Sequence, residues 1–343
     1  MDSAMDDKQR PAGAGLFLGM DVGSVSVDSV VLDPAGRVIW SDYTRNQGRP
    51  LTAAAQVLRR VFAQHPRQDF AVMAVTGTGA ATLAPLTGAE PVNEIIALTR
   101  GAAQLAPEAR SIIDMGGEDA KLILVSPDGR GGLKIDDFAM NTMCAAGTGS
   151  FLDQQSHRLQ LTIEQFSEVA LRSKNPPRLA GRCSVFAKSD MIHLQQEATP
   201  DYDIVAGLCF AMARNLKSNI AKGKTVVPPV LFCGGVAANQ GVRRALVEIM
   251  EISAKDLIVP ELFACVGALG AALVARDQGL ARAIADLAAL ETRAAETSRD
   301  TKRLPRLDLA PRHLEDKKTI TVPEGPLRGY LGVDVGSIST NVV

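Results

Sequence analysis

The sequence contains little of what would mark a metal or redox protein built on clustered cysteines or histidines. Of its 343 residues only 4 are histidines and 5 are cysteines, and no two cysteines stand in a CxxC pattern. A zinc ribbon, a thioredoxin-like motif and a His-rich metal site are therefore not indicated. The odd number of scattered cysteines also argues against a disulfide framework and favours a reducing compartment.

Charge of one sign and long apolar runs are also lacking. The chain has 37 basic and 38 acidic residues and a formal net charge of -1, so no overall field would attract nucleic acid or an anionic membrane. No apolar run reaches the roughly 18 residues that span a bilayer, and the first residues lack the apolar stretch of a signal peptide. We expect a cytoplasmic globular protein with about two domains or lobes.

The two commonest nucleotide-binding motifs are absent, since there is no GxxxxGK[ST] and no GxGxxG that opens a strand-to-helix turn. Instead, an apolar strand ends in Asp21-Val-Gly-Ser24. Backbone N–H groups in this turn would face a phosphate, Gly23 permits close approach, and Ser24 adds a hydroxyl donor. Asp21 would hold Mg²⁺ on the phosphates, directly or through water. Taken alone, the motif also fits a purely structural hairpin.

Two further strands end in glycine turns of the same kind. In Asp114-Met-Gly-Gly-Glu118 the glycines offer bare backbone to the phosphates, and Asp114 would hold Mg²⁺ or orient the attacking water. The apolar segment 230–233 runs into Gly234 and Gly235, where a helix N-terminus would seat an adenosine. The predicted nucleotide-binding residues are Gly23, Ser24, Gly116, Gly117, Glu118, Gly234, Gly235 and Val236.

Strand and helix patterns alternate along the chain, which indicates an α/β protein. Residues 18–26 recur as residues 331–339, with an offset of 313 from Asp21 to Asp334. This offset has the size of a whole two-lobed domain rather than of a solenoid repeat. We expect a disordered tail (1–14), a first lobe (15–110), a second lobe with a closing C-terminal helix (111–280), a helix and linker (281–327), and the first strand of a truncated second module (328–343).

The three loops in this order resemble the superfamily of actin, sugar kinases and chaperone ATPases. Segments 76–79, 93–95, 114–121, 140–153 and 267–273 are similar to the ATPase family that contains the activators of 2-hydroxyacyl-CoA dehydratases and the ATPase subunits of benzoyl-CoA reductases. The resemblance covers roughly residues 15–280, and its most specific part is the segment around Cys144. It implies a two-lobed, ribonuclease H-like fold, each lobe a mixed sheet flanked by helices, with ATP and Mg²⁺ in the cleft.

The resemblance further implies a homodimer that shares one 4Fe-4S cluster, with two cysteine ligands from each subunit. Carried over to this sequence, the ligands are Cys144 and Cys183. A cubane needs four thiolates, and a two-fold axis turns two per chain into four. In the family, ATP hydrolysis drives a low-potential electron from the cluster to a partner acyl-CoA dehydratase or reductase, and a ferredoxin or flavodoxin supplies it. The other three cysteines, Cys209, Cys233 and Cys265, are expected to be buried packing residues.

Three alternatives remain open at this point. A sugar or small-molecule kinase of the same superfamily would have no cluster, and Cys144 would be structural. A non-hydrolysing ATP sensor is suggested by Asp28, because many relatives carry a lysine there and the second copy of the motif has Asn341. The sequence also resembles long fused activators, so the second module would replace the other subunit in a pseudo-dimer.

Overall fold

The computed structural model describes residues 15–141, 147–180, 184–299, 325–326, 329–335 and 340–342. The chain divides into two compact units, residues 1–299 and 300–343. The expected tail 1–14, most of the expected linker, and both Cys144 and Cys183 lie outside the described residues.

The first sheet has five strands in the order β3-β2-β1-β4-β5. Its strands are β1 (Leu16–Val22), β2 (Ser26–Leu32), β3 (Val38–Arg45), β4 (Phe70–Thr76) and β5 (Glu90–Pro91). The first three form an antiparallel meander, whereas β4 and β5 run parallel to β1. The turn from β2 to β3 closes where the amide of Gly36 donates to the carbonyl of Asp33 at 2.9 Å; Gly36 has φ +85°, which glycine adopts without strain.

Helices cover both faces of this sheet. On one side lie α1 (Pro50–Gln64), α2 (Ala80–Thr87) and α10 (Ala288–Arg299), which bury apolar side chains of the sheet such as Met20. On the other side α9 (Val266–Asp277) packs against Phe17 and Val30. A Cβ atom at Gly19 would collide with the carbonyl of Ala268, so the close approach of β1 and α9 depends on glycine.

The second sheet repeats the same plan, with strand order β10-β9-β6-β7-β8. Its strands are β6 (Ser111–Met115), β7 (Ala120–Pro127), β8 (Leu133–Met140), β9 (Val230–Cys233) and β10 (Leu257–Ile258). Again the first three are antiparallel in succession and the last two are parallel to β6. Its helices are α4 (Gly149–Arg158), α5 (Ile163–Ala170), α6 (Ser184–Gln196), α7 (Asp201–Asn215) and α8 (Gln240–Met250).

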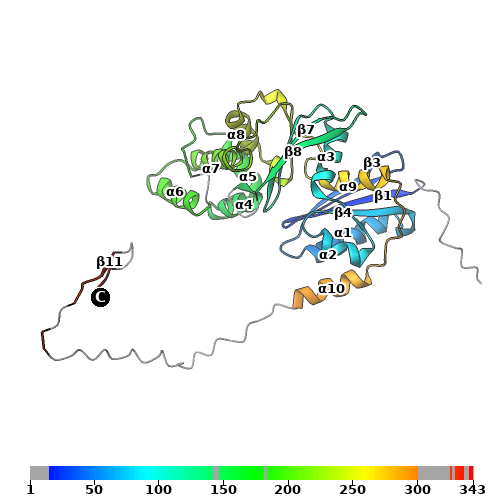
Figure 1. Cartoon of the computed structure of the whole chain (residues 1–343), viewed down its shortest axis with the longest axis horizontal. Coiled ribbons are helices and arrows are strands. Elements are labelled where there is room, and N and C mark those ends of the chain that lie inside the picture. Colours follow the sequence, from blue (N-terminus) through cyan, green and yellow to red (C-terminus); the bar gives the residue numbers. More distant parts are fainter. Residues whose placement is uncertain are drawn as a thin grey trace, which may run out of the picture. The chain divides into compact units, whose positions relative to one another are not determined.

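The largest core lies between this sheet and α4, α5, α7 and α8, where Phe151, Phe166 and Phe232 are fully buried. The opposite face of the sheet packs on α3 (Glu94–Leu105). Helix α3 also packs against α9, since a Cβ atom at Gly270 would collide with the carbonyl of Ala97. The pair α3 and α9 therefore lies between the two sheets (Figure 1).

These two mixed sheets flanked by helices confirm the predicted α/β fold class. Helix α9 follows the strands of the second sheet in sequence, and we expected it to close the second lobe, but it packs on the first sheet. Its small residues fit closely over β1 and β4, and sequence position alone does not reveal this packing.

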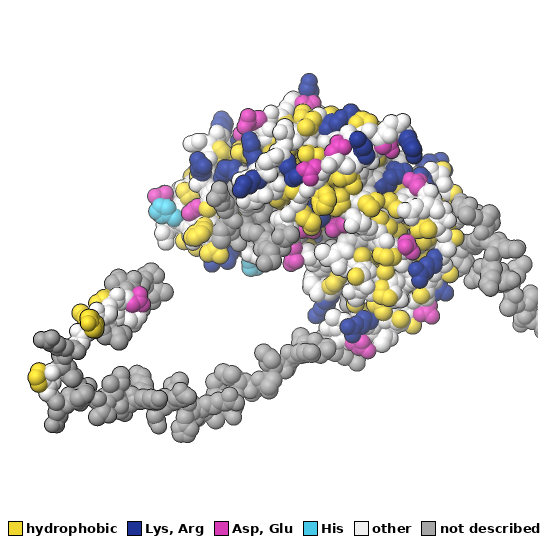
Figure 2. Space-filling view, viewed as in Figure 1, with side chains coloured by type: hydrophobic (Ala, Val, Ile, Leu, Met, Phe, Trp, Pro, Cys, Tyr) yellow, Lys and Arg dark blue, Asp and Glu magenta, His cyan; other side chains and the backbone are white. Residues whose placement is uncertain are grey.

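The surface matches the balanced composition. Figure 2 shows acidic and basic side chains intermixed over the visible face of the first unit. Within the part of the chain that the structure describes, no helix has both the length and the apolar character needed to cross a membrane.

The second unit contains a short antiparallel pair, β11 (Val333–Val335) and β12 (Thr340–Val342). Asp334 lies opposite Asn341 in this pair, as Asp21 lies opposite Asp28 between β1 and β2. The sequence repeat thus extends to the pairing of the strands.

Candidate functional site

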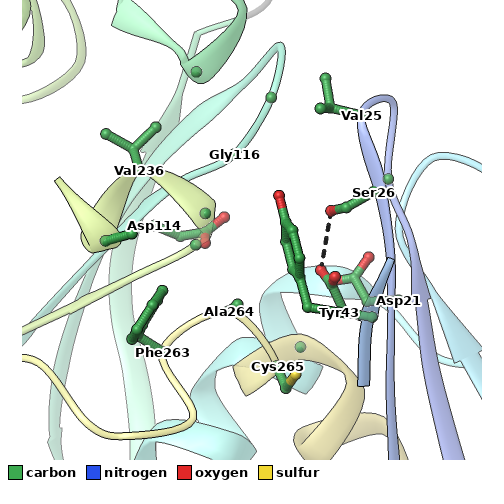
Figure 3. A pocket seen from close by; sticks show the side chains of 18 of the residues that line it. Asp21, Val25, Ser26, Tyr43, Asp114, Gly116, Val236, Phe263, Ala264 and Cys265 are labelled. Atoms are coloured by element: carbon green, nitrogen blue, oxygen red, sulfur yellow. Dashed lines mark hydrogen bonds between the residues drawn. The ribbon is translucent and has the colours of Figure 1, made fainter. Parts of the chain in front are cut away.

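A cleft of about 1030 Å³ lies between the loops of the two sheets. Figure 3 shows it from close by, with Asp21 on one wall and Asp114 on the other. All of the residues predicted to bind nucleotide or Mg²⁺ line this cleft: Asp21, Gly23, Ser24, Asp114, Gly116, Gly117, Glu118, Gly234, Gly235 and Val236. The structure therefore brings together three loops that are far apart in the sequence.

The first loop follows β1 and is closed by backbone hydrogen bonds. The amide of Gly23 donates to the carbonyl of Ser26 at 2.9 Å, and the side-chain amide of Asn46 donates to the carbonyl of Gly23 at 2.9 Å. The carboxylate of Asp21 lies against two glycines, because a Cβ atom at Gly77 or Gly267 would collide with its oxygens. Backbone from two other segments thus confines the Asp21 side chain.

The second loop, between β6 and β7, is equally tight. The amide of Gly116 donates to the carbonyl of Asp119 at 2.9 Å. A Cβ atom at Gly234 would lie 2.7 Å from Oδ1 of Asp114, so the third glycine turn closes over this carboxylate. The two lobes also approach each other here, since a Cβ atom at Gly117 would collide with the side chain of Val25. The glycines therefore permit a close approach of backbone that no other residue would allow.

Lys121 is a site residue whose role the sequence reasoning missed. Its ammonium group lies 2.7 Å from Asp119, 2.9 Å from Glu94 and 3.4 Å from Asp114, and its side chain is 1% exposed. Burial alone would lower the pKa of Lys121, but the carboxylates, Asp114 first, raise it above its usual value. The one available signal was a charged residue inside the apolar run 120–125.

The two acids at the strand ends, Asp21 and Asp114, are largely withdrawn from water and lie near other acids. Burial, and then the carboxylates of Glu94 and Asp114, raise the pKa of Asp21 to about 8. Burial also raises the pKa of Asp114, although Lys121 opposes the shift. Such groups bind a proton or a cation readily, because either one relieves the unfavourable burial of negative charge.

The donor set fits Mg²⁺ bound together with nucleotide phosphates. Among the residues described, no three His, Cys, Asp or Glu side chains gather into a metal site of their own. Mg²⁺ commonly takes only one or two carboxylates and completes its octahedron with phosphates and water. Asp21 and Asp114 offer such carboxylates from opposite walls of the cleft.

Helix α4 is attached directly to the second loop. The amide of Gly149 donates to the carbonyl of Gly116 at 2.9 Å, and the amide of Ser150 donates to the carbonyl of Gly117 at 2.8 Å. An ion pair between Asp153 of α4 and Arg45 of β3 links the same helix to the first sheet. In sequence α4 comes directly after the segment that holds Cys144, which lies outside the described residues.

A polar row crosses the first sheet beside the cleft. Asp21 pairs with Thr76 on one neighbouring strand and with Asp28 on the other, and Asp28 in turn pairs with Tyr43. Asp28 and Tyr43 both line the cleft, and Figure 3 shows the Tyr43 ring reaching into it. Tyr43 was not predicted as a site residue, because its position depends on strand pairing.

The other cysteines are buried, as expected for packing residues. Cys209 and Cys233 are 0% exposed and Cys265 is 5% exposed. Burial raises the pKa of Cys209 and Cys265 to about 12, so these thiols stay protonated. The predicted ligand Cys183, like Cys144, lies outside the residues that the structure describes.

Comparison with known protein sequences finds relatives that are named as activators of acyl-CoA dehydratases. The chain is 34% identical over 264 residues to the 2-hydroxyisocaproyl-CoA dehydratase activator of Clostridioides difficile, which covers 76% of this chain and 95% of that protein. It is 31% identical over 262 residues to the (R)-2-hydroxyglutaryl-CoA dehydratase activating ATPase of Acidaminococcus fermentans, covering 75% of this chain and 96% of the relative.

Comparison with solved structures gives the same result. The activator of the 2-hydroxyisocaproyl-CoA dehydratase from Clostridium difficile with bound ADPNP matches with a TM-score of 0.70 and 30% identity, over 84% of this chain and 99% of that one. This match confirms the actin-like ATPase fold. The model of the BadF/BadG/BcrA/BcrD ATPase family matches residues 18–275. The chain therefore belongs to the BadF/BadG/BcrA/BcrD ATPase family.

Proposed function

We propose that this protein is an ATP-dependent activator that uses ATP hydrolysis to drive a low-potential electron from a shared 4Fe-4S cluster to a partner 2-hydroxyacyl-CoA dehydratase or related reductase. Its relatives bear the names of dehydratase activators, and one matching structure contains ADPNP. A ferredoxin or flavodoxin would supply the electron. The cluster would lie between two copies of the chain or between two modules of a longer chain.

The cleft provides what ATP hydrolysis requires. In this proposal the amide of Gly117 and the hydroxyl of Ser24 donate to the phosphates, and the bare backbone of Gly23 and Gly116 lets the phosphates approach closely. Gly234 and Gly235 face the nucleoside. Asp21 and Asp114 would hold Mg²⁺, which when bound neutralises phosphate charge and orients the nucleotide. Asp114 also orients the attacking water, and the Lys121 ammonium keeps its carboxylate charged and in position.

One observation carries the coupling of hydrolysis to electron transfer. The carbonyls of Gly116 and Gly117, in the predicted phosphate loop, accept hydrogen bonds from the first turn of α4. A shift of this loop when the γ-phosphate leaves would therefore move α4 and the segment that precedes it. That segment contains Cys144, one of the two proposed cluster ligands with Cys183. The cluster, when bound, would hold the electron that is passed on.

The decisive experiment is an anaerobic measurement of iron and of the EPR spectrum of the full chain. The wild type should be brown and contain about four irons per dimer, and Cys144→Ser and Cys183→Ser should each lose iron and the EPR signal. Cys209→Ala is the matched control, because Cys209 is buried in the core of the second lobe. Colourless wild-type protein that still binds ATP after anaerobic reconstitution would refute the redox function and leave the fold untouched.

A further inference from the structure

The two lobes place different residues opposite their predicted Mg²⁺ ligands. Asp114 of β6 lies opposite Lys121 of β7, and in the same place of the first sheet Asp21 of β1 lies opposite Asp28 of β2. Directly paired residues of neighbouring strands project from the same face of the sheet. The second lobe therefore places a cation beside its acid, whereas the first lobe places a second acid there.

Asp28 has a carboxylate oxygen without a partner. The residue is 8% exposed and lines the cleft. Its Oδ2 accepts a hydrogen bond from the Ser26 hydroxyl at 3.3 Å, drawn as the dashed line in Figure 3. Its Oδ1 is buried and has no hydrogen-bond partner among the described residues. Buried polar atoms are nearly always satisfied, and Asp28 lines the cleft, so this oxygen is free to accept a donor or a cation that binds there.

The cleft has little positive charge to balance its acids. Among the described residues that line it, Arg45 is the only basic one, and it is paired with Asp153. Eleven of the described residues that line it are acidic, among them Asp21, Asp28 and Asp114. Lys121 is already shared among three of these carboxylates. A nucleoside triphosphate adds further negative charge, so cations that enter with it would relieve the repulsion.

We propose that Asp28 is a ligand of a second divalent cation, which binds together with the nucleotide and is distinct from the Mg²⁺ assigned to Asp21 and Asp114. The Oδ1 atom of Asp28 provides the protein ligand, and phosphate oxygens and water provide the others. A hard oxygen donor set of this kind is typical of Mg²⁺ and Mn²⁺. The proposal rests on the proposed function, because the phosphates of ATP complete the site.

The test counts the Mn²⁺ ions that the full chain retains per bound ADPNP in equilibrium dialysis at a fixed free Mn²⁺ concentration. Wild-type protein should retain about two, and Asp28→Asn about one. The asparagine variant copies the residue that this chain itself carries at the equivalent position, Asn341. Asp42→Asn is the matched control, because the Asp42 carboxylate is already bound by Arg60 and Thr44. It should retain about two ions, as the wild type does.

Each outcome decides a separate claim. If wild type and Asp28→Asn both retain one Mn²⁺ with ADPNP bound, the second site is refuted and the proposed ATP site stands. If both retain two, the second ion has other ligands and the assignment of Asp28 is wrong. If the wild type retains no ADPNP, the proposed function itself fails. Should Asp28→Asn not fold, as judged by circular dichroism, Asp28→Ser takes its place, and retention of two ions by that variant would show that Asp28 is not the ligand.

Discussion

The hairpins that open the two sheets are built alike and differ in charge. Each has an acid at the end of its first strand, a glycine turn, and a partner residue on the next strand, which is Lys121 in the second lobe and Asp28 in the first. In the second lobe the Lys121 ammonium group is shared among Asp114, Asp119 and Glu94. The first hairpin instead places the acids Asp21 and Asp28 side by side, with no basic residue between them in the strand pairing. One backbone plan therefore supports two different electrostatic environments.

Removal of Lys121 should have the largest effect, because it takes the only cation out of the second hairpin's ion-pair network among the described residues. In Lys121→Met the carboxylates of Asp114, Asp119 and Glu94 lose their shared partner. Loss of one partner of a buried ion pair costs about 3–5 kcal/mol, so we expect the free energy of unfolding to fall by about that much and ATP hydrolysis to cease. Denaturant unfolding and an ATPase assay measure the two effects.

Lys134→Met is the control for this prediction. Its side chain is 62% exposed and lies 3.6 Å from Asp136, so its loss should change stability by less than about 0.5 kcal/mol. Equal losses for Lys121→Met and Lys134→Met would mean that the buried network does not hold the second loop.

Substitution of Asp114 should abolish most ATP hydrolysis and leave nucleotide binding in place. Asp114→Asn removes the residue that we assign to the attacking water, so kcat should fall by about 10²-fold or more while ADPNP still binds. Glu248→Gln, an exposed acid of the same lobe that pairs with Arg244, should leave kcat unchanged. Wild-type protein without any turnover to lose would favour the ATP sensor over the activator.

The pH dependence of stability, measured without nucleotide or divalent cations, should report the burial of Asp21 in the first hairpin. The pKa of Asp21 is about 8 in the folded protein, against an ordinary value of 3.8 for an aspartate. The folded state therefore keeps its proton while the unfolded state loses it. The contribution of Asp21 to the free energy of unfolding should be fully present below a pH of about 4 and should be lost toward pH 8, by at most about 1.4 kcal/mol per pH unit.

Asp21→Asn should flatten this decrease, because the asparagine does not titrate. Urea unfolding between pH 5 and about 8 measures the slope. A variant with the wild-type slope would show that Asp21 is already ionised in the folded protein and that its burial is less costly than the cleft geometry implies.

The parts of the site that were predictable from sequence are local. An acid at the end of an apolar strand followed by glycine can be read from a few adjacent residues, and these loops line the cleft as a group. The partners of Lys121 come from α3, β6 and the turn before β7, and the row from Thr76 to Tyr43 depends on strand register. Interactions of this kind are set by tertiary packing, and no local pattern reveals them.

The smallest effect concerns the ion pair that joins the two lobes. Arg45 of β3 and Asp153 of α4 have side chains that are 46% and 32% exposed, so a double-mutant cycle with Arg45→Ala and Asp153→Ala should give a coupling energy of only about 0.2–1 kcal/mol. The pair of Arg60 and Asp42 lies within the first lobe and is the matched control. If nucleotide moves α4 through the second loop, ADPNP should change the first coupling energy and not the second. Equal values with and without ADPNP would mean that the loop and the helix do not move relative to the first sheet, and the proposed transmission to the cysteine segment would then be wrong.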